Sequence, residues 1–494
     1  MLRSFEPLFR RTLMVAVVLW LPAQQALQPI TDTDIWWHLS AGRWMVENGK
    51  LPTTDPFTRM GAEGREWMAY SWLYEVLMYG LYDLLGLRAM ILYTLVLALA
   101  AAGTILWLVR RQTRGSLLPF ILSAAAMVSM LGLIYDRPWM LSILLFAALL
   151  VVLWKGRSRP GWLWWTVPLF WVWANIHIVF VYGLAVMGFA LLDGLAGRMG
   201  YGDPQRHFDP RAVAKVLGVS LLATLLTPHH VFLWTVIAEL VRETTPFRLV
   251  QELQAPQFRT IHEWTFLFMS VGAAAALGWR RRRDVFAILL LLAGIYLSHR
   301  AARDVWFAAI SSALILSDCL AGTVLDPEDK PEERLAARHL PWAGVWLLAG
   351  LLLTGKWVWL DNGRLEQSVA RHFPVAAADH VVQERYTGPL YNHFEWGGYL
   401  IWRLHDVGLP VSIDGRTNIS GERRLQLNTN SWFGYHGDWQ RDPDLRTANL
   451  VLGPSRMPLL YLLEASGTFR KVYSDEQATV MVRVASHQGS EPGG

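Results

Sequence analysis

The sequence predicts an α-helical polytopic membrane protein with about 11 transmembrane helices and a small C-terminal α/β soluble domain. Hydrophobic residues make up 53% of the 494 residues, and charged residues make up only 17%, whereas soluble domains carry about 25% charged residues. The apolar residues gather in runs of about 20, the length that crosses a bilayer as a helix. The 26 tryptophans agree with this class, because Trp concentrates where a bilayer meets water.

The predicted spanning segments are chosen by length and apolarity. They cover residues 13–30, 88–109, 117–134, 138–154, 161–175, 178–195, 211–227, 263–279, 284–298, 302–320 and 340–359. The first follows three arginines, as a signal peptide would, but Ala-Gln-Gln-Ala at 23–26 is a poor cleavage site, so we expect a retained helix. The apolar stretch 69–87 carries Glu75 and Asp83, so we expect it to lie in the membrane interface.

The basic residues between these segments predict the orientation. With the N-terminus in the cytoplasm, the basic clusters fall on one side: Arg110, Arg111 and Arg114; Lys155, Arg157 and Arg159; 198–215; 280–283; and 330–338. We therefore expect a multi-pass protein of the bacterial inner (plasma) membrane with an extracytoplasmic C-terminal domain. The formal charge of +5 lies in these clusters and indicates no nucleic-acid partner.

The predicted domains are a transmembrane domain over 1–359, an α/β domain over 360–485 and a disordered tail over 486–494. The transmembrane domain includes an extracytoplasmic loop over 31–87. In the α/β domain, predicted strands alternate with predicted helices. The strands cover 388–392, 410–413, 448–452 and 479–484, and the helices cover 375–385, 396–405 and 458–467.

Two carboxylates, Asp32 and Asp34, directly follow the first predicted helix. If a second helix begins near Asp34, then His38, Gly42 and Met45 share its stripe. Three tryptophans would anchor that helix in the membrane interface: Trp36, Trp37 and Trp44. A carboxylate at the bilayer edge can act as a general base toward an acceptor hydroxyl. The alternative is that Asp32 or Asp34 simply caps the helix.

This loop resembles the GT-C superfamily of polytopic glycosyltransferases, which take a sugar from a polyprenyl-phosphate donor. The resemblance rests on Asp34 after the first helix, a His at +4, a small residue at +8, Met at +11 and Gly at +15. It implies that Asp34 is the catalytic base. The relatives usually have Asp-Glu, whereas Ile35 follows Asp34 here, so Asp32 is the candidate for the second acid and the division of labour between the two stays open.

Further fragments, in order along the chain, resemble one bacterial branch of that superfamily. They are Asp-x-Asp-Ile-Trp-Trp-His-Leu at 32–39, Pro-Thr-Thr-Asp-Pro-Phe at 52–57, Arg137-Pro138, Trp-Ala-Asn-Ile-His at 173–177, and Trp-Gly-Gly-Tyr-Leu with Ile-Asp-Gly-Arg within 396–416. The resemblance covers most of the chain and implies a GT-C-like architecture. It leaves the sugar and the acceptor open.

The outward turn at 299–304 contains the candidates for donor phosphate binding. Arg300 and Arg303 carry planar guanidinium groups that suit phosphate oxygens, and Arg137 is a third candidate. The alternative is that the pair only anchors helix ends to lipid headgroups or pairs with Asp304. Six further residues are predicted to bind substrate: His38, Arg43, His177, Trp396, Asp414 and Arg416. For the last three, the alternative is a structural turn built around the paired glycines 397–398.

A divalent metal is a further possibility, because His and carboxylate ligands suit a transition metal. The candidates are His177, His229, His230, His262 and Glu263. No close ligand spacing supports a site, so solvated interfacial histidines are the favoured interpretation, and the metal stays open.

These features favour an inverting glycosyltransferase that moves a sugar from a polyprenyl-phosphate-linked donor to an extracytoplasmic acceptor. Its partners would be that donor and the membrane lipid. A transporter is the main alternative, but few ionisable residues lie deep in the predicted spans and no inverted repeat is evident. A non-catalytic scaffold in envelope polysaccharide assembly is a third possibility that the sequence does not exclude.

Overall fold

The chain forms two compact units, and each is assembled from two separate stretches of sequence. The computed structural model describes residues 2–115, 117–202, 206–242, 251–280, 284–327 and 340–484. Unit 1 comprises Met1–Gln28 and Arg88–Asp361, and unit 2 comprises Pro29–Leu87 and Asn362–Gly494. The predicted disordered tail over 486–494 lies outside the described residues.

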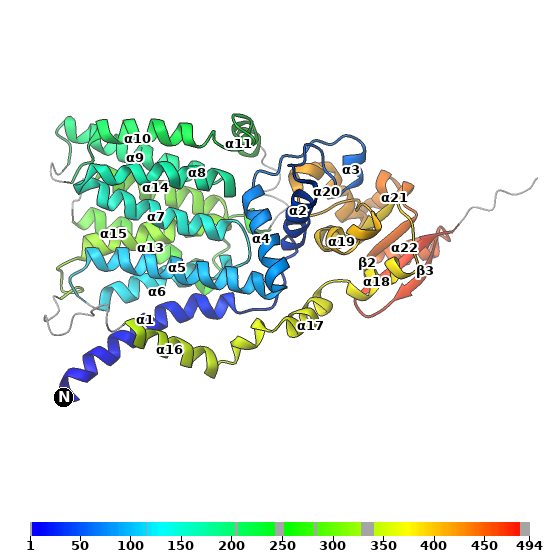
Figure 1. The fold of residues 1–494 in the computed structure, drawn as a ribbon, viewed down its shortest axis with the longest axis horizontal. Coiled ribbons are helices and arrows are strands. Elements are labelled where there is room, and N and C mark those ends of the chain that lie inside the picture. The colour runs from blue at the N-terminus through cyan, green and yellow to red at the C-terminus, as the bar shows by residue number, and fades with distance from the viewer. Residues whose placement is uncertain are drawn as a thin grey trace, which may run out of the picture. The chain divides into compact units, whose positions relative to one another are not determined.

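Unit 1 is a bundle of helices (Figure 1), and a helix lies over each predicted spanning segment. The α-helices are α1 (Leu2–Ala26), α5 (Arg88–Gln112), α6 (Leu117–Met130), α7 (Trp139–Ser158), α8 (Thr166–Ile176), α9 (Phe180–Arg198), α10 (Pro210–Ala223), α11 (Phe232–Arg242), α13 (Ile261–Trp279), α14 (Val285–Arg300), α15 (Val305–Leu320) and α16 (Leu340–Leu353). The shorter 3-10 helices are η1 (Leu131–Leu133), η2 (Pro160–Trp165), η3 (Gln251–Leu253), η4 (Ala302–Asp304) and η7 (Lys356–Leu360).

Among the described residues of unit 1, three helices are long and apolar enough to cross a membrane: α5, α7 and α9. The stretches Leu117–Leu133, Val285–Arg300 and Leu340–Leu353 are shorter apolar helices. At the centre, α15 is buried on almost all sides against α6, α13 and α14, which is why it is apolar all round rather than amphipathic. The chain is a membrane protein, and the number of about 11 crossings stays a prediction.

Unit 2 combines the segment after α1 with the C-terminal part of the chain. Its α-helices are α2 (Ile35–Asn48), α3 (Arg59–Ala62), α4 (Trp72–Leu85), α17 (Asn362–His372), α18 (Val375–Gln383), α19 (Gly397–Arg403), α20 (Thr417–Phe433), α21 (Pro443–Thr447) and α22 (Pro458–Ala465). The 3-10 helices are η8 (Phe394–Trp396), η9 (His405–Val407) and η10 (Tyr435–Gln440). The strands are β1 (Leu390–Asn392), β2 (Leu450–Pro454), β3 (Phe469–Ser474) and β4 (Ala478–Arg483).

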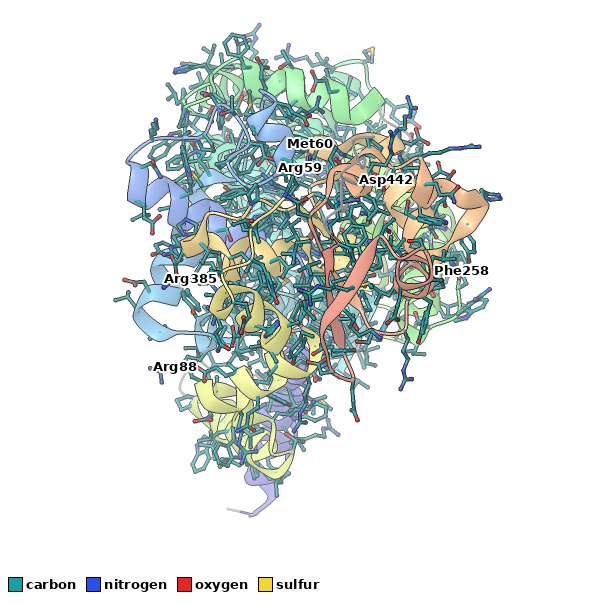
Figure 2. The ribbon with its side chains drawn as sticks, turned by 90° about the vertical axis from the view of Figure 1, so that its right-hand side faces the viewer. Arg59, Met60, Arg88, Phe258, Arg385 and Asp442 are labelled. Atoms are coloured by element: carbon teal, nitrogen blue, oxygen red, sulfur yellow. The ribbon has the colours of Figure 1, made fainter. Side chains whose placement is uncertain are left out.

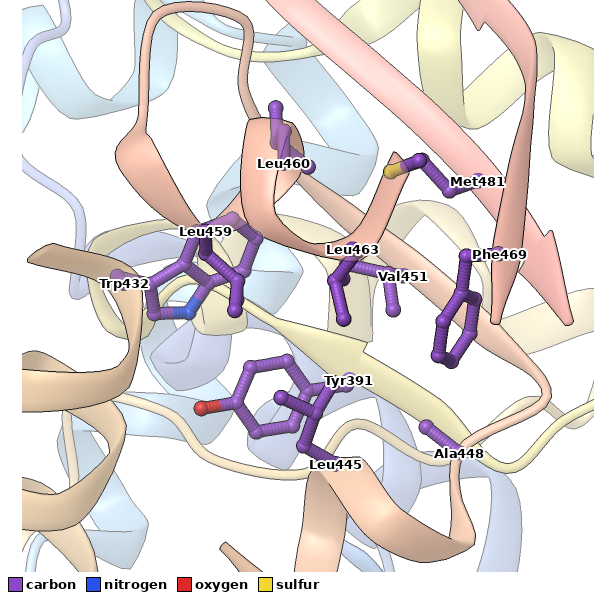
Figure 3. Close-up of a cluster of buried hydrophobic side chains, with 10 residues drawn as sticks. All are labelled: Tyr391, Trp432, Leu445, Ala448, Val451, Leu459, Leu460, Leu463, Phe469 and Met481. Atoms are coloured by element: carbon purple, nitrogen blue, oxygen red, sulfur yellow. The ribbon is translucent and has the colours of Figure 1, made fainter. Parts of the chain in front are cut away.

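The four strands form one sheet in the order β1-β2-β4-β3. Strands β1 and β2 are parallel, whereas β4 pairs antiparallel with both β2 and β3. The side chains of one buried cluster, shown in Figure 3, pack between this sheet and its helices: Tyr391, Trp432, Leu445, Ala448, Val451, Leu459, Leu460, Leu463, Phe469 and Met481. The C-terminal part therefore has its own hydrophobic core, as the strand and helix alternation predicted.

The predicted strand at 410–413 is wrong, because this stretch belongs to none of the four strands. It makes only an isolated bridge, in which Val411 pairs in parallel with Thr58. The partner of Val411 therefore comes from the segment after α1, and the pairing joins the two stretches of unit 2. Strand β3 was not predicted. Its residues do not alternate between buried and exposed positions, since most of them are exposed or half-buried.

Helix α2 begins at Ile35, close to the predicted start, and it packs against α4 and α19. The predicted stripe faces this packing, since His38, Gly42 and Met45 are all buried. The prediction that Trp36 and Trp37 lie in the membrane interface is wrong. Both are buried inside unit 2, where Trp36 makes edge-to-face contacts with Phe373 and Tyr399.

Candidate functional site

The candidate site lies in unit 2, where the segment after α1 meets the C-terminal part. Their backbones are joined at one place: the amide of Val411 donates to the carbonyl of Phe57, and the amide of Arg59 donates to the carbonyl of Val411. The side chain of Arg59, labelled in Figure 2, donates to the carbonyl of Asp444 and to the hydroxyl of Thr447. The loop is thus held to the C-terminal part by backbone and side-chain bonds together.

Asp34 occupies the N-cap position of α2, but within the described segment its side chain makes no capping hydrogen bond. Asp32 supplies the local acceptor instead, since its Oδ1 lies 2.8 Å from the amide nitrogen of Asp34. Such a bond from an Asp to the amide two residues later is the usual Asx turn. The capping interpretation therefore fits Asp32 and does not fit the Asp34 side chain. Both residues are half-buried.

Two glycines bring the C-terminal backbone up to Asp34. A Cβ on Gly398, in the first turn of α19, would lie 2.7 Å from the carbonyl oxygen of Thr33. A Cβ on Gly415 would overlap Oδ1 of Asp34 itself. Only glycine permits such close approach, which explains the paired glycines of the α19 motif and the glycine of Ile-Asp-Gly-Arg. The Asp34 carboxylate therefore lies against the backbone of the C-terminal part.

The next residue, Arg416, is the centre of a buried ion-pair group. Its Nε and Nη2 lie 2.9 and 2.6 Å from the two carboxylate oxygens of Asp414, and Nη2 lies 2.9 Å from Oδ1 of Asp55. All three residues are buried. Burial alone would lower the pKa of Arg416, but the two carboxylates outweigh it and the pKa is raised. Arg416 is therefore permanently charged.

Aromatic rings surround this guanidinium group. Its central carbon lies 4.6 Å from the ring centroid of Trp67 and 5.1 Å from that of Phe57, distances at which a cation is attracted to a ring face. Trp37 lies at 5.9 Å. The roles predicted for Asp414 and Arg416 in substrate binding stay predictions, because both side chains contact mainly other protein groups in this structure.

Glu75 is the residue of the site that the sequence reasoning missed. It lies on α4 and is 1% exposed, and its Oε1 lies 3.2 Å from Nδ1 of His38. Burial raises the pKa of Glu75 to about 8, although the charge of Arg416 opposes this rise. The signal in the sequence is a carboxylate within an apolar helix, a pattern that also fits a helix at the membrane interface.

The remaining candidates of unit 2 have protein partners. Arg43 donates from Nε to Glu47 and from Nη2 to Asp406, both at 2.8 Å. Trp396 is buried and lies edge-on to His393. The Gly at +15, Gly49, ends α2 in the left-handed conformation with φ 62°, as glycine commonly does after a helix.

The other candidates belong to unit 1. Arg300 is the last residue of α14, and Arg303 lies in η4. The charges of both arginines act on the buried carboxylate of Asp304, which also accepts a hydrogen bond of 3.0 Å from the hydroxyl of Tyr182. The guanidinium of Arg137 lies 5.1 Å from the Trp139 ring centroid.

His177 follows the end of α8 and lies 2.9 Å from the hydroxyl of Ser142. The histidines and carboxylates of the described ranges form no group of three or more that could hold a metal ion. The identity of any metal stays open.

The fold is shared with a protein of known structure. No family model and no curated relative matches the sequence. ArnT from Cupriavidus metallidurans, bound to undecaprenyl phosphate, is similar with a TM-score of 0.51 at 16% identity, over 97% of this chain and 98% of that one. Its apo state gives the same values. The chain has the GT-C fold.

An oligosaccharyltransferase from Archaeoglobus fulgidus is also similar, with a TM-score of 0.48 at 11% identity, over 98% of this chain and 75% of that one. This likeness is too distant to add to the assignment. The GT-C fold confirms the family resemblance seen in the loop after the first helix, at the level of the fold. In this chain, that loop is the stretch that packs with the C-terminal part of unit 2.

Proposed function

We propose that the chain is an inverting glycosyltransferase that moves a sugar from a polyprenyl-phosphate-linked donor to an acceptor outside the cytoplasm. The GT-C fold supports the reaction class, and the undecaprenyl phosphate bound to the similar ArnT supports the donor class. The basic clusters between the helices support a cytoplasmic N-terminus and an extracytoplasmic unit 2 in the bacterial plasma membrane.

The observation that carries the proposal is the position of the Asp34 carboxylate. It lies half-buried at the start of α2, against Gly415, while Asp32 takes over the local hydrogen bond to the backbone. In the proposed reaction, Asp34 accepts the proton of the acceptor hydroxyl. The acceptor oxygen forms a bond to the anomeric carbon as the bond to the phosphate oxygen breaks, and polyprenyl phosphate leaves with that electron pair. Attack opposite to the leaving phosphate inverts the anomeric centre.

Two further roles complete the proposal. Asp32 orients Asp34 through the amide that it holds, and it is the second acid next to the base. Arg300 and Arg303 bind the phosphate of the donor, because a guanidinium pair neutralises the charge that the leaving group carries. The sugar and the acceptor are left open.

The test is the nearly isosteric substitution Asp34→Asn. We expect activity to fall roughly 10²–10⁴-fold, because an amide cannot accept the proton. The purified chain is assayed in detergent with radiolabelled undecaprenyl-phosphate sugars, one hexose and one pentose, by release of the sugar to membrane acceptors or to water. Glu395→Gln, at an exposed position of η8, is the matched control and keeps full activity. Full activity in Asp34→Asn would remove this residue as the base.

A further inference from the structure

The backbone of the C-terminal part approaches Asp34 closely at Gly415. Gly415 lies so close that a single added carbon would overlap Oδ1 of Asp34. Gly398 makes a similar approach to the carbonyl of Thr33, one residue earlier. The position of the carboxylate thus depends on where the turn 413–416 lies.

Arg416 fixes that turn from its other side. Its backbone amide and Nε both donate to Oδ1 of Asp414, at 2.8 and 2.9 Å. These bonds close a tight ring around Gly415, which lies between the two residues in the sequence. The glycine cannot shift without disturbing a buried charge pair.

Asp55 ties the same guanidinium to the segment after α1. Besides accepting from Nη2 of Arg416 at 2.9 Å, it accepts from the amides of Phe57 and Thr58, both at 3.2 Å. Thr58 also forms the isolated bridge with Val411. The hydrogen bonds within its own loop therefore fix the Asp55 carboxylate independently of Arg416.

We infer that Asp55, Arg416 and Asp414 form a positioning clamp that holds Gly415 against Asp34 and so sets the place of the catalytic carboxylate. The clamp residues are positioning residues, because their charged groups pair with one another inside the protein. The inference rests on the proposed function of Asp34. According to this inference, the C-terminal part positions the catalytic carboxylate, in addition to any contact that it makes with the acceptor.

The first test asks whether Gly415 sets the position of Asp34, without using activity. Gly415→Ala adds one carbon at a backbone conformation that other residues adopt, since its φ is not in the left-handed region. The rate at which a water-soluble carbodiimide labels Asp34 is followed by peptide mass spectrometry in the full chain. We expect the rate to change several-fold. Gly80→Ala is the control, because Gly80 lies on α4 with open space around it. An unchanged rate in Gly415→Ala overturns the inference.

The second test asks whether the clamp acts through Asp34. Gly415→Ala should lower kcat by roughly 10²-fold, the cost of a misplacement of about 1 Å, with little change in the donor KM. Combined with Asp34→Asn, it should add no further loss, because two changes that act through one group are not additive. If kcat of the double variant falls by roughly a further 10²-fold, Gly415 acts through a group other than Asp34. That result would contradict the inference and would leave Asp34 as the base.

Arg416→Lys applies the same double-variant test to the clamp itself. Lys keeps the charge, but a single ammonium cannot replace a planar fork that reaches two carboxylates. We expect Arg416→Lys to lower kcat. In the Asp34→Asn background, Arg416→Lys should cause no further loss of kcat. If Asp34→Asn alone is fully active, the proposed function fails, whereas the labelling result still decides whether the clamp positions this carboxylate.

Discussion

Asp55 and Arg416 form an ion pair of 2.9 Å in which the two side chains are 0% and 2% exposed. One residue comes from the loop after the first helix and the other from the C-terminal part of the chain. Removing one member of such a buried pair leaves an uncompensated charge and costs about 3–5 kcal/mol. The pair therefore links the folding of two distant stretches of sequence.

The first prediction follows from this pair. Arg416→Ala should lower the melting temperature of the purified chain markedly, because it leaves both Asp55 and Asp414 buried without their cation. The control is Arg470→Ala, an exposed position on β3, where a change within about 0.5 kcal/mol is expected. Equal melting of the two variants would mean that water, rather than Arg416, neutralises the two carboxylates.

A second prediction separates Asp32 from Asp34. Asp32→Ala should cost roughly 1 kcal/mol of stability, because the amide of Asp34 loses its acceptor. Asp32→Asn keeps an acceptor oxygen and should melt like the wild type, with a smaller loss of activity than Asp34→Asn. The comparison uses thermal melts and sugar transfer on the same preparations. If Asp32→Asn were the more damaging of the two Asn variants, the roles of the acids would be exchanged.

The third prediction concerns pH and Glu75. Its pKa in the folded chain is about 8, above its ordinary value of 4.5, so the folded state binds this proton more tightly than the unfolded state does. The contribution of Glu75 to stability is therefore fully present below about pH 4.5 and is lost as the pH rises to about 8.

The measurement compares Glu75→Gln with the wild type in melts from pH 5 to pH 8. Glutamine stays neutral, so the melting temperature of the variant should rise relative to the wild type as the pH increases. His38 and Arg416, the ionisable groups that act on Glu75, are retained in both proteins. Parallel curves over this range would contradict a protonated Glu75.

A fourth prediction tests the donor phosphate site in unit 1. Replacing both Arg300 and Arg303 by Gln should raise the donor KM at least about 10-fold and lower kcat less, because this binding exists before the transition state. The control replaces Arg110 and Arg111, in the last turn of α5, by Gln. An unchanged donor dependence in the folded Arg300 and Arg303 double variant would make the pair a membrane anchor only.

The fifth prediction concerns topology. A periplasmic reporter enzyme fused after residue 484 should be active in cells, and a reporter that needs the cytoplasm should be silent there. The physical reason is the basic clusters, which are retained on the cytoplasmic side of a bacterial membrane. The opposite pattern would place unit 2 and the Asp34 site in the cytoplasm.

The sequence by itself determined the helical membrane class, the small C-terminal sheet and the helix that starts next to Asp34. These features come from local patterns, since apolar runs, periodicity and turn residues are read within about 20 positions. The same patterns placed His38, Gly42 and Met45 on one face of α2, which the structure confirms.

Only the tertiary structure decided that Gly415 approaches Asp34 and which charged groups of unit 2 are buried. In the sequence, Glu75 indicates a helix at the membrane interface, and Asp414 and Arg416 are predicted to bind substrate, because local patterns do not show which charged groups are buried together. Each is buried with a partner: Asp55 and Asp414 pair with Arg416, and Glu75 lies 3.2 Å from His38. Burying a charge is tolerated only with such a partner. Trp36 and Trp37 are buried for the same kind of reason, since the C-terminal part of unit 2 covers a face that local patterns assigned to the membrane interface.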